Sequence, residues 1–210
     1  QMVELRHNSQ TCMICNDRSL NFIDWKSLKS YPAKKFPSIP IKIISREQNT
    51  VYILCQNGVL YLCDMRSNRS MSISFNRVLT PSALTSWRQS PAIGIGFKEG
   101  LVDLFDPRVM LVFKSVVTEP VYNIVPAQRN ACNFAIASDD KVLIYNADNK
   151  KDDELGKPDL SIIVDSPFIS PYDGNVIVAG INDVYHIDCE VFQRSSILGD
   201  FYQKKNLGIR

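Results

Sequence analysis

Cys12 and Cys15 stand three positions apart, the spacing used by many zinc and redox sites. A structural zinc ion needs four ligands, and neither a second such cysteine pair nor a histidine pair stands at a suitable distance. Both residues also fall in an apolar run typical of a β-strand, where residues three apart point to opposite faces of the sheet. We therefore interpret the two thiols as packing residues and predict no metal site.

Catalytic chemistry has few other candidates in the sequence. The only histidines are His7, which has no recognisable nucleophile context, and His186, which sits inside an apolar run as a packed strand residue would. The Gly94–Gly96 segment is too short for a phosphate-binding loop, and no common hydrolase, metalloprotease or calcium-loop motif occurs. The sequence predicts no catalytic residue, no cofactor and no enzymatic activity.

Basic residues cluster in one part of the chain. The cluster comprises Lys26, Lys29, Lys34, Lys35, Lys42 and Arg46, and Arg66, Arg69, Arg77 and Arg88 continue the bias. Acidic residues gather later, at 139–140 and 148–154. We interpret the cluster first as solvated loop charge, and we interpret the segment around Pro32, Pro37 and Pro40 as a crossing between strands. A positive face for an acidic peptide or an RNA backbone is the alternative.

The overall composition is that of an ordinary globular domain. Of 210 residues 45% are hydrophobic and 22% charged, and the net charge is +2. No apolar run is long enough to span a membrane, and the first residues lack the apolar stretch of a signal peptide. Because no secretory signal is visible, we interpret the six cysteines as reduced core residues and predict an intracellular protein, cytoplasmic or nuclear. They are Cys12, Cys15, Cys55, Cys63, Cys132 and Cys189.

The elements that position these residues repeat along the chain. Five apolar runs end on Asp or Asn, and these anchors are spaced 40, 42, 40 and 42 residues apart. Each run follows a turn signal and another apolar run, as in a β-hairpin. The anchors are Asp24, Asp64, Asp106, Asn146 and Asp188; the turns are Asn16-Asp17, Asn57-Gly58, Glu99-Gly100, Asp139-Asp140 and Asn182-Asp183.

A hairpin in each copy of a repeat of about 41 residues is typical of β-propeller blades. We predict an all-β propeller of four-stranded blades over residues 1–198 and a basic tail over 199–210. Two of the expected strands are the outer strand of the third blade at 110–113 and the first strand of the fourth at 121–125. A polar surface loop is expected at 148–159. The blades are predicted at about 1–37, 38–78, 79–118, 119–165 and 166–198, and we expect them to belong to a larger ring, such as one of seven blades.

The repeats resemble divergent WD40 blades. The resemblance rests on the period and on the Asp or Asn that ends each third strand, since the Trp before that Asp is replaced in every copy. The Gly-His pair that usually opens a WD40 repeat is also missing. The resemblance therefore implies the architecture and no close relative.

Two neighbouring copies share a finer feature. Asp64-Met65-Arg66 and Asp106-Pro107-Arg108 both read Asp-x-Arg directly after the third strand. WD40 substrate receptors of cullin-RING ubiquitin ligases carry paired Trp-Asp-x-Arg boxes there, and the resemblance implies that Arg66 and Arg108 would face the ligase adaptor. An Asp two residues before an Arg is also typical of a turn after a strand, so the competing interpretation is that these residues cap turns.

The sequence thus favours a non-catalytic scaffold or adaptor that binds other proteins, as peptides or as a second propeller, within a multiprotein complex. Rigid blades that present many loops suit such a role. Two narrower hypotheses remain: a ubiquitin-ligase substrate receptor acting through Asp64, Arg66, Asp106 and Arg108, and an RNA- or chromatin-associated subunit acting through Lys26, Lys29, Lys34 and Lys35.

Overall fold

The computed structural model describes residues 2–4, 11–24, 26–47, 50–64, 67, 69–75, 78–87, 90–127, 133–146, 157–189 and 193–196. In these residues every regular element is a β-strand. The first eight are β1 (Met2–Glu4), β2 (Thr11–Asn16), β3 (Ser19–Asp24), β4 (Lys29–Lys35), β5 (Pro40–Glu47), β6 (Thr50–Cys55), β7 (Val59–Asp64) and β8 (Arg69–Ser74). The next four are β9 (Pro81–Ser86), β10 (Ile93–Phe97), β11 (Leu101–Asp106) and β12 (Leu111–Val117). The last eight are β13 (Asn123–Pro126), β14 (Phe134–Ala137), β15 (Lys141–Tyr145), β16 (Leu160–Ile163), β17 (Phe168–Tyr172), β18 (Asn175–Ala179), β19 (Val184–Asp188) and β20 (Gln193–Ser196).

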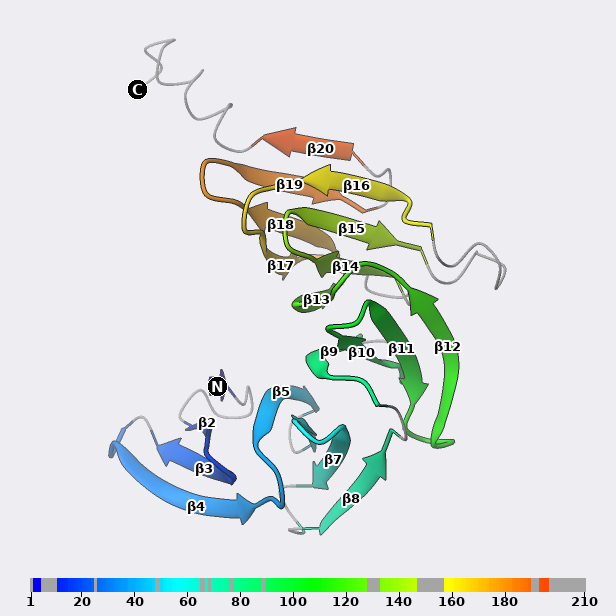
Figure 1. Ribbon diagram of the computed structural model, residues 1–210. Coiled ribbons are helices and arrows are strands. Elements are labelled where there is room, and N and C mark those ends of the chain that lie inside the picture. Colours follow the sequence, from blue (N-terminus) through cyan, green and yellow to red (C-terminus); the bar gives the residue numbers. More distant parts are fainter. Residues whose placement is uncertain are drawn as a thin grey trace. The chain divides into compact units, whose positions relative to one another are not determined.

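Consecutive strands form five four-stranded sheets, each ordered as the chain runs (Figure 1). Neighbouring strands pair antiparallel, as in β6 with β7 and β14 with β15. A four-stranded antiparallel meander repeated every 40 to 42 residues is a propeller blade, so the predicted β-propeller fold is confirmed.

One backbone hydrogen bond recurs in four of the sheets. The carbonyl of the residue before the third strand accepts the N–H of the residue after the fourth strand. The pairs are Arg18 O with Phe36 N (2.7 Å), Gly58 O with Phe75 N (3.3 Å), Gly100 O with Thr118 N (2.9 Å) and Asp140 O with Val164 N (2.8 Å). The repeat first seen as a spacing of residue types is therefore also a repeat of backbone contacts.

Burial follows the position of a strand in its sheet. All residues of β10 and β14 are buried, although successive side chains point to opposite faces. The outer strand β8 is almost entirely exposed. Burial on both faces requires cover from two sides, which explains why the middle strands are continuous apolar runs.

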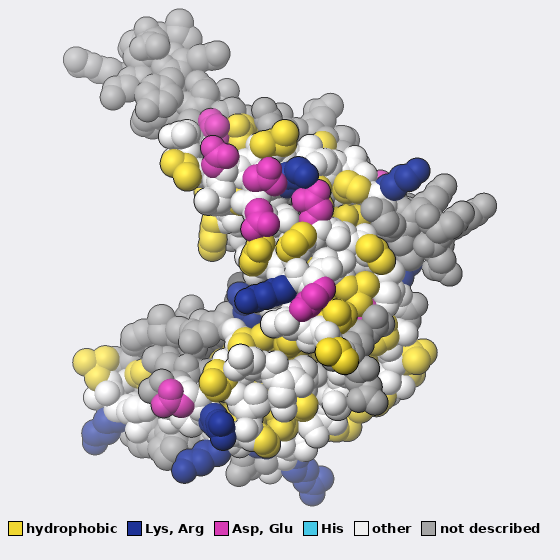
Figure 2. Space-filling model, viewed as in Figure 1, with side chains coloured by type: hydrophobic (Ala, Val, Ile, Leu, Met, Phe, Trp, Pro, Cys, Tyr) yellow, Lys and Arg dark blue, Asp and Glu magenta, His cyan; other side chains and the backbone are white. Residues whose placement is uncertain are grey.

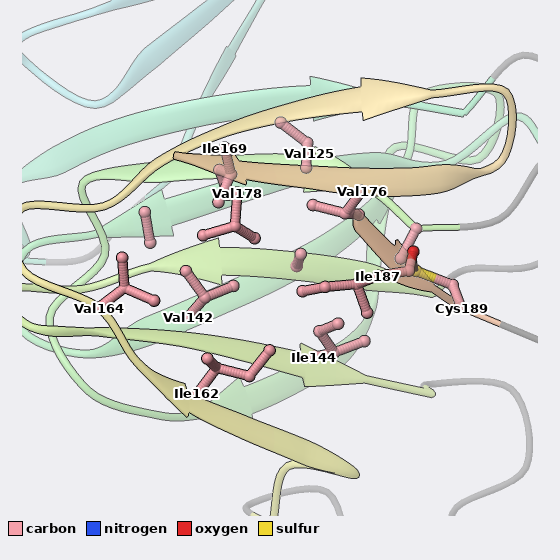
Figure 3. Packing of buried hydrophobic residues seen from close by; sticks show 13 residues of the cluster. Val125, Val142, Ile144, Ile162, Val164, Ile169, Val176, Val178, Ile187 and Cys189 are labelled. Carbon is pink, nitrogen blue, oxygen red and sulfur yellow. Dashed lines mark hydrogen bonds between the residues drawn. The ribbon is translucent and has the colours of Figure 1, made fainter. Parts of the chain in front are cut away.

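The chain divides into two compact units, residues 1–84 and 85–210, and the division falls inside β9. The first unit has a core that includes Leu20, Phe36, Ile53 and Cys63. In the second, aliphatic residues of the β13–β16 sheet pack against those of the β17–β20 sheet (Figure 3). Those labelled in the figure are Val125, Val142, Ile144, Ile162 and Val164 on one side and Ile169, Val176, Val178, Ile187 and Cys189 on the other.

The segment around Pro32 differs from the prediction. It was expected to cross between strands, but Lys29–Lys35 is the outer strand β4. Proline lacks the N–H that a central strand needs and is tolerated on an edge, and the pairing of β3 with β4 has an irregularity opposite this segment. Pro40 is the first residue of β5, another position open to proline.

Two other strand bounds were also wrong. β12 begins at Leu111 and extends to Val117, because Met110 has a φ of 57° and belongs to the turn. β13 begins at Asn123, because Val121 and Tyr122 belong to the crossing, where their N–H groups donate to the carbonyls of Phe97 and Ala137. The expected loop at 148–159 and the tail at 199–210 lie almost wholly outside the described residues, of which 157–159 belong to the loop.

No helix that could cross a membrane occurs among the described residues.

Candidate protein-interaction surfaces

The Asp106–Arg108 step forms a closed turn. The Asp106 carboxylate accepts the backbone N–H of Arg108 at 2.9 Å, and it also accepts Nε at 3.1 Å and Nη2 at 2.7 Å. The Arg108 side chain is 69% exposed, and its hydrogen bond to Asp106 raises the pKa of the guanidinium. The geometry is that of a capped turn whose guanidinium already uses two of its donors.

The same turn occurs in the first sheet. Asp24 accepts the N–H of Lys26 at 2.8 Å and that of Ser27 at 3.4 Å. The hydrogen bond from Lys26 lowers the pKa of Asp24 and keeps the carboxyl ionised. Asp64 ends β7 at the corresponding place, whereas Arg66 lies outside the described residues. Turn capping thus accounts for the two anchors whose side-chain contacts are described.

Four of the six predicted basic residues, Lys26, Lys29, Lys34 and Lys35, lie in or next to the outer strand β4, whereas Lys42 and Arg46 lie in β5, the first strand of the next sheet. Lys26, Lys29 and Lys35 are exposed. Lys34 is half-buried, and its ammonium donates to the hydroxyl of Ser70 in β8. Figure 2 shows Lys and Arg side chains along the border where Figure 1 places β4 and β8.

In the second unit, four large apolar side chains are exposed at one end of the sheets. Val117 ends β12, Ile163 ends β16, Tyr122 precedes β13 and Ile181 follows β18. Their exposed fractions are 67%, 74%, 45% and 71% in that order. We call this end the turn rim, defined by residues 98–101, 117–122, 138–141, 163–166 and 180–183.

Backbone hydrogen bonds make the turn rim continuous. The crossing residues Val121 and Tyr122 donate their N–H groups to Phe97 O at 3.2 Å and to Ala137 O at 3.0 Å, which lie in two successive sheets, and Ile181 N donates to Asp165 O at 3.3 Å. The turns of three consecutive sheets are thereby joined into one surface. A shallow pocket of about 120 Å3 lies within it, lined by residues 163–165 and 180–183.

The turn rim is acidic. Its carboxylates are Glu99, Glu119, Asp139, Asp140, Asp165 and Asp183, and Figure 2 shows Asp and Glu side chains interspersed with hydrophobic ones over this unit. Lys141 donates to Glu119 at 2.8 Å, which raises the pKa of the Lys141 ammonium. A hydrogen bond to Asp139 raises the pKa of the Tyr122 hydroxyl. The surface therefore combines exposed apolar groups with an excess of negative charge.

The apolar part of the turn rim was not predicted from the sequence. Its exposure depends on where each strand ends, and two of the relevant strand ends were misplaced. One local signal was available: Ile181 stands directly before the Asn182-Asp183 turn, where a large aliphatic residue has no strand to pack against.

Of the residues considered for metal or acid–base chemistry, only His186 has a side chain that the structure describes. Cys55, Cys63 and Cys189 are buried and form no disulfide, and burial raises the pKa of the Cys189 thiol to about 12. His186 lies 3.3 Å from the Asn175 amide and packs edge-on against the Tyr172 ring.

Cys12 and Cys15 lie in β2 as predicted, and His7 and Cys132 lie outside the described residues. The part of the chain that the structure describes contains no group of three His, Cys, Asp or Glu residues placed to bind a metal ion.

The comparisons with known proteins identify a fold and no family. No protein-family model matches the sequence, and no similar protein is found among curated proteins. A chain in the crystal structure of the mitotic checkpoint complex superposes with a TM-score of 0.70 over 92% of this chain and 68% of that chain, at 10% sequence identity. As many as 1398 solved chains are similar to this one, so the similarity supports a WD40-like propeller fold without indicating a particular partner.

Proposed function

We propose that the protein is a non-catalytic scaffold that binds a partner protein at the turn rim. The observation that carries this proposal is the set of four exposed apolar side chains, Val117, Tyr122, Ile163 and Ile181, on turns joined by backbone hydrogen bonds. Exposed apolar patches rimmed by polar residues are typical of protein interfaces.

The chemistry of the turn rim defines the kind of partner. Apolar groups would bury against its four apolar side chains, and Lys or Arg residues would meet its carboxylates. Removing one large aliphatic side chain from contact with a partner costs about 1.5–3 kcal/mol, and each 1.4 kcal/mol corresponds to a tenfold change in affinity. Two such side chains are therefore enough to control binding.

The test is affinity purification of the protein with cross-linking from its own cells, comparing wild type with Tyr122→Asp/Ile181→Asp. The double variant is expected to lose its stoichiometric partners at least about tenfold. The matched control is Leu111→Asp, which places a new carboxylate at an exposed apolar position of β12 outside the turn rim. Equal recovery of partners by the wild type and the double variant would refute the proposal.

The ligase-receptor hypothesis is a narrower version of this function. Its support is that Arg108 is exposed next to the strand end, where its guanidinium retains donors beyond those that Asp106 accepts. Co-purification of a propeller-type ligase adaptor is expected to fall in Arg66→Ala/Arg108→Ala. The control is Arg108→Lys, which keeps the charge but loses bidentate geometry. Unchanged adaptor recovery in the double variant rejects the hypothesis. The compartment and the number of blades in a complete ring stay predictions.

A further inference from the structure

Two stretches of the chain contain cations and no acid. Residues 25–46 hold six Lys and Arg, residues 65–98 hold five, and neither stretch holds an Asp or Glu, although the chain has 22 of them. The two units consequently differ in charge. Residues 1–84 contain 11 basic and 5 acidic residues, a net charge of +6, and residues 85–210 contain 13 and 17, a net charge of −4.

The fold brings the end of the outer strand of the first stretch close to the start of the outer strand of the second. β4 comes from the first stretch and β8 from the second, and the hydrogen bond from Lys34 to Ser70 joins them. Lys26, Lys29, Lys35 and Arg69 are exposed around this contact. The exposed hydroxyls of Ser70, Ser72 and Ser74 lie along β8. We call Lys26, Lys29, Lys34, Lys35, Arg69 and these three serines the basic outer face.

The need to keep sheet edges from pairing with other sheets does not explain why this surface carries so many cations. Lysines on outer strands discourage pairing with other sheets. The outer strand β12 serves as a comparison: it exposes Leu111 and Val117 and carries a single Lys114. An outer strand of this protein therefore does not require a series of cations. Asp24 and Asp64 lie opposite Lys29 and Arg69 in register at the strand starts, so the five cations of this face stand beside two carboxylates and exceed them by three.

We infer that the basic outer face binds the phosphate backbone of a nucleic acid without reading its sequence. Ammonium groups and hydroxyls are the side-chain donors that usually contact phosphates. The seven residues of β4 extend over about 20 Å, which matches roughly six phosphates of one duplex strand at about 3.4 Å each.

The composition of the face favours a nucleic acid over an acidic protein. Protein interfaces are enriched in aromatic residues and depleted in Lys. None of the first-unit aromatic side chains whose burial the structure describes is exposed, and the charge of the basic outer face is mostly Lys. Nucleic-acid binding through this face is separate from partner binding at the turn rim, and either can fail without the other.

The test measures binding of the purified full chain to a fluorescent DNA duplex of about 20 base pairs across salt concentrations. Wild type is expected to bind with a steep salt dependence. Lys26→Glu/Lys35→Glu is expected to bind at least about tenfold more weakly, with a salt slope smaller by about 2. Both residues are exposed, so thermal unfolding should be unchanged; if it is not, Lys26→Gln/Lys35→Gln replaces the charge reversal.

The matched control is Lys114→Glu/Lys157→Glu, which changes the net charge equally on the other unit. Little change in this control, together with weakened binding in the test variant, supports the inference. Equal weakening in both variants, a flat salt dependence, or displacement of the duplex by polyglutamate at equal charge concentration overturns it. The last outcome would assign the face to an acidic protein instead.

Discussion

Replacing Gly100 with alanine is expected to lower the free energy of unfolding by about 3 kcal/mol or more. Gly100 has a φ of 83°, a conformation that costs an L-residue about 1–2 kcal/mol. A Cβ there would also lie 2.4 Å from the carbonyl oxygen of Thr118, the residue whose N–H donates to the Gly100 carbonyl. Because both atoms in this clash are held by the same turn, neither can move away without breaking the hydrogen bond.

Gly58 provides the matched control for this prediction. It occupies the same place in the preceding sheet, with a φ of 77°, but its nearest neighbour to a Cβ is the Phe75 oxygen at 3.7 Å, an ordinary contact. Gly58→Ala should therefore lower the free energy of unfolding only by the cost of placing an L-residue at positive φ, about 1–2 kcal/mol. Urea unfolding followed by circular dichroism measures both variants. Equal costs would show that the close contact at Gly100 relaxes freely.

Replacing Trp87 with alanine is expected to destabilise the second unit by about 3–5 kcal/mol. Trp87 is the largest fully buried side chain among the described residues. Its indole N–H donates to the Asn133 carbonyl at 2.7 Å, and its ring meets that of Phe134 edge-on with centroids 6.4 Å apart. Truncation removes the apolar contacts, leaves a cavity and breaks the hydrogen bond at once.

Trp87→Phe separates these contributions. A phenyl ring keeps much of the apolar packing and loses the hydrogen bond, while Asn133 O retains the N–H of Ala127 at 2.9 Å. We expect a cost of about 1–2 kcal/mol, well below that of alanine. Urea unfolding followed by circular dichroism serves here too, because the signal does not depend on the indole that is removed. An alanine variant that costs less than about 1 kcal/mol would contradict the close packing described here.

The two glycine positions show why the blades could be predicted from the sequence. Asn57-Gly58 and Glu99-Gly100 predict turns because glycine adopts positive φ without strain. The apolar runs on either side predict paired strands. These signals are local and recur in every copy. The predicted anchors Asp64 and Asp106 are accordingly the last residues of β7 and β11.

The candidate surfaces were less predictable. The basic residues could be seen as a cluster, but not their arrangement, because the outer strand β4 contains Pro32 and looked like a crossing. For Arg108 the sequence left a partner contact and turn capping as alternatives, and the structure shows its guanidinium held by Asp106. The exposed apolar residues of the turn rim gave almost no signal, because Val117 and Ile163 have the same residue types as buried neighbours.

The sequence by itself determined that this protein is a series of four-stranded propeller blades, because period, alternation and turn chemistry are properties of short segments. Only the tertiary structure decided which side chains those blades leave exposed. Exposure depends on contacts between residues that are not neighbours in the chain. Examples are the hydrogen bonds that Lys34 donates to Ser70, Val164 N donates to Asp140 O and Ile181 N donates to Asp165 O. For that reason the fold could be predicted from spacing, while the two proposed binding surfaces required the packed structure.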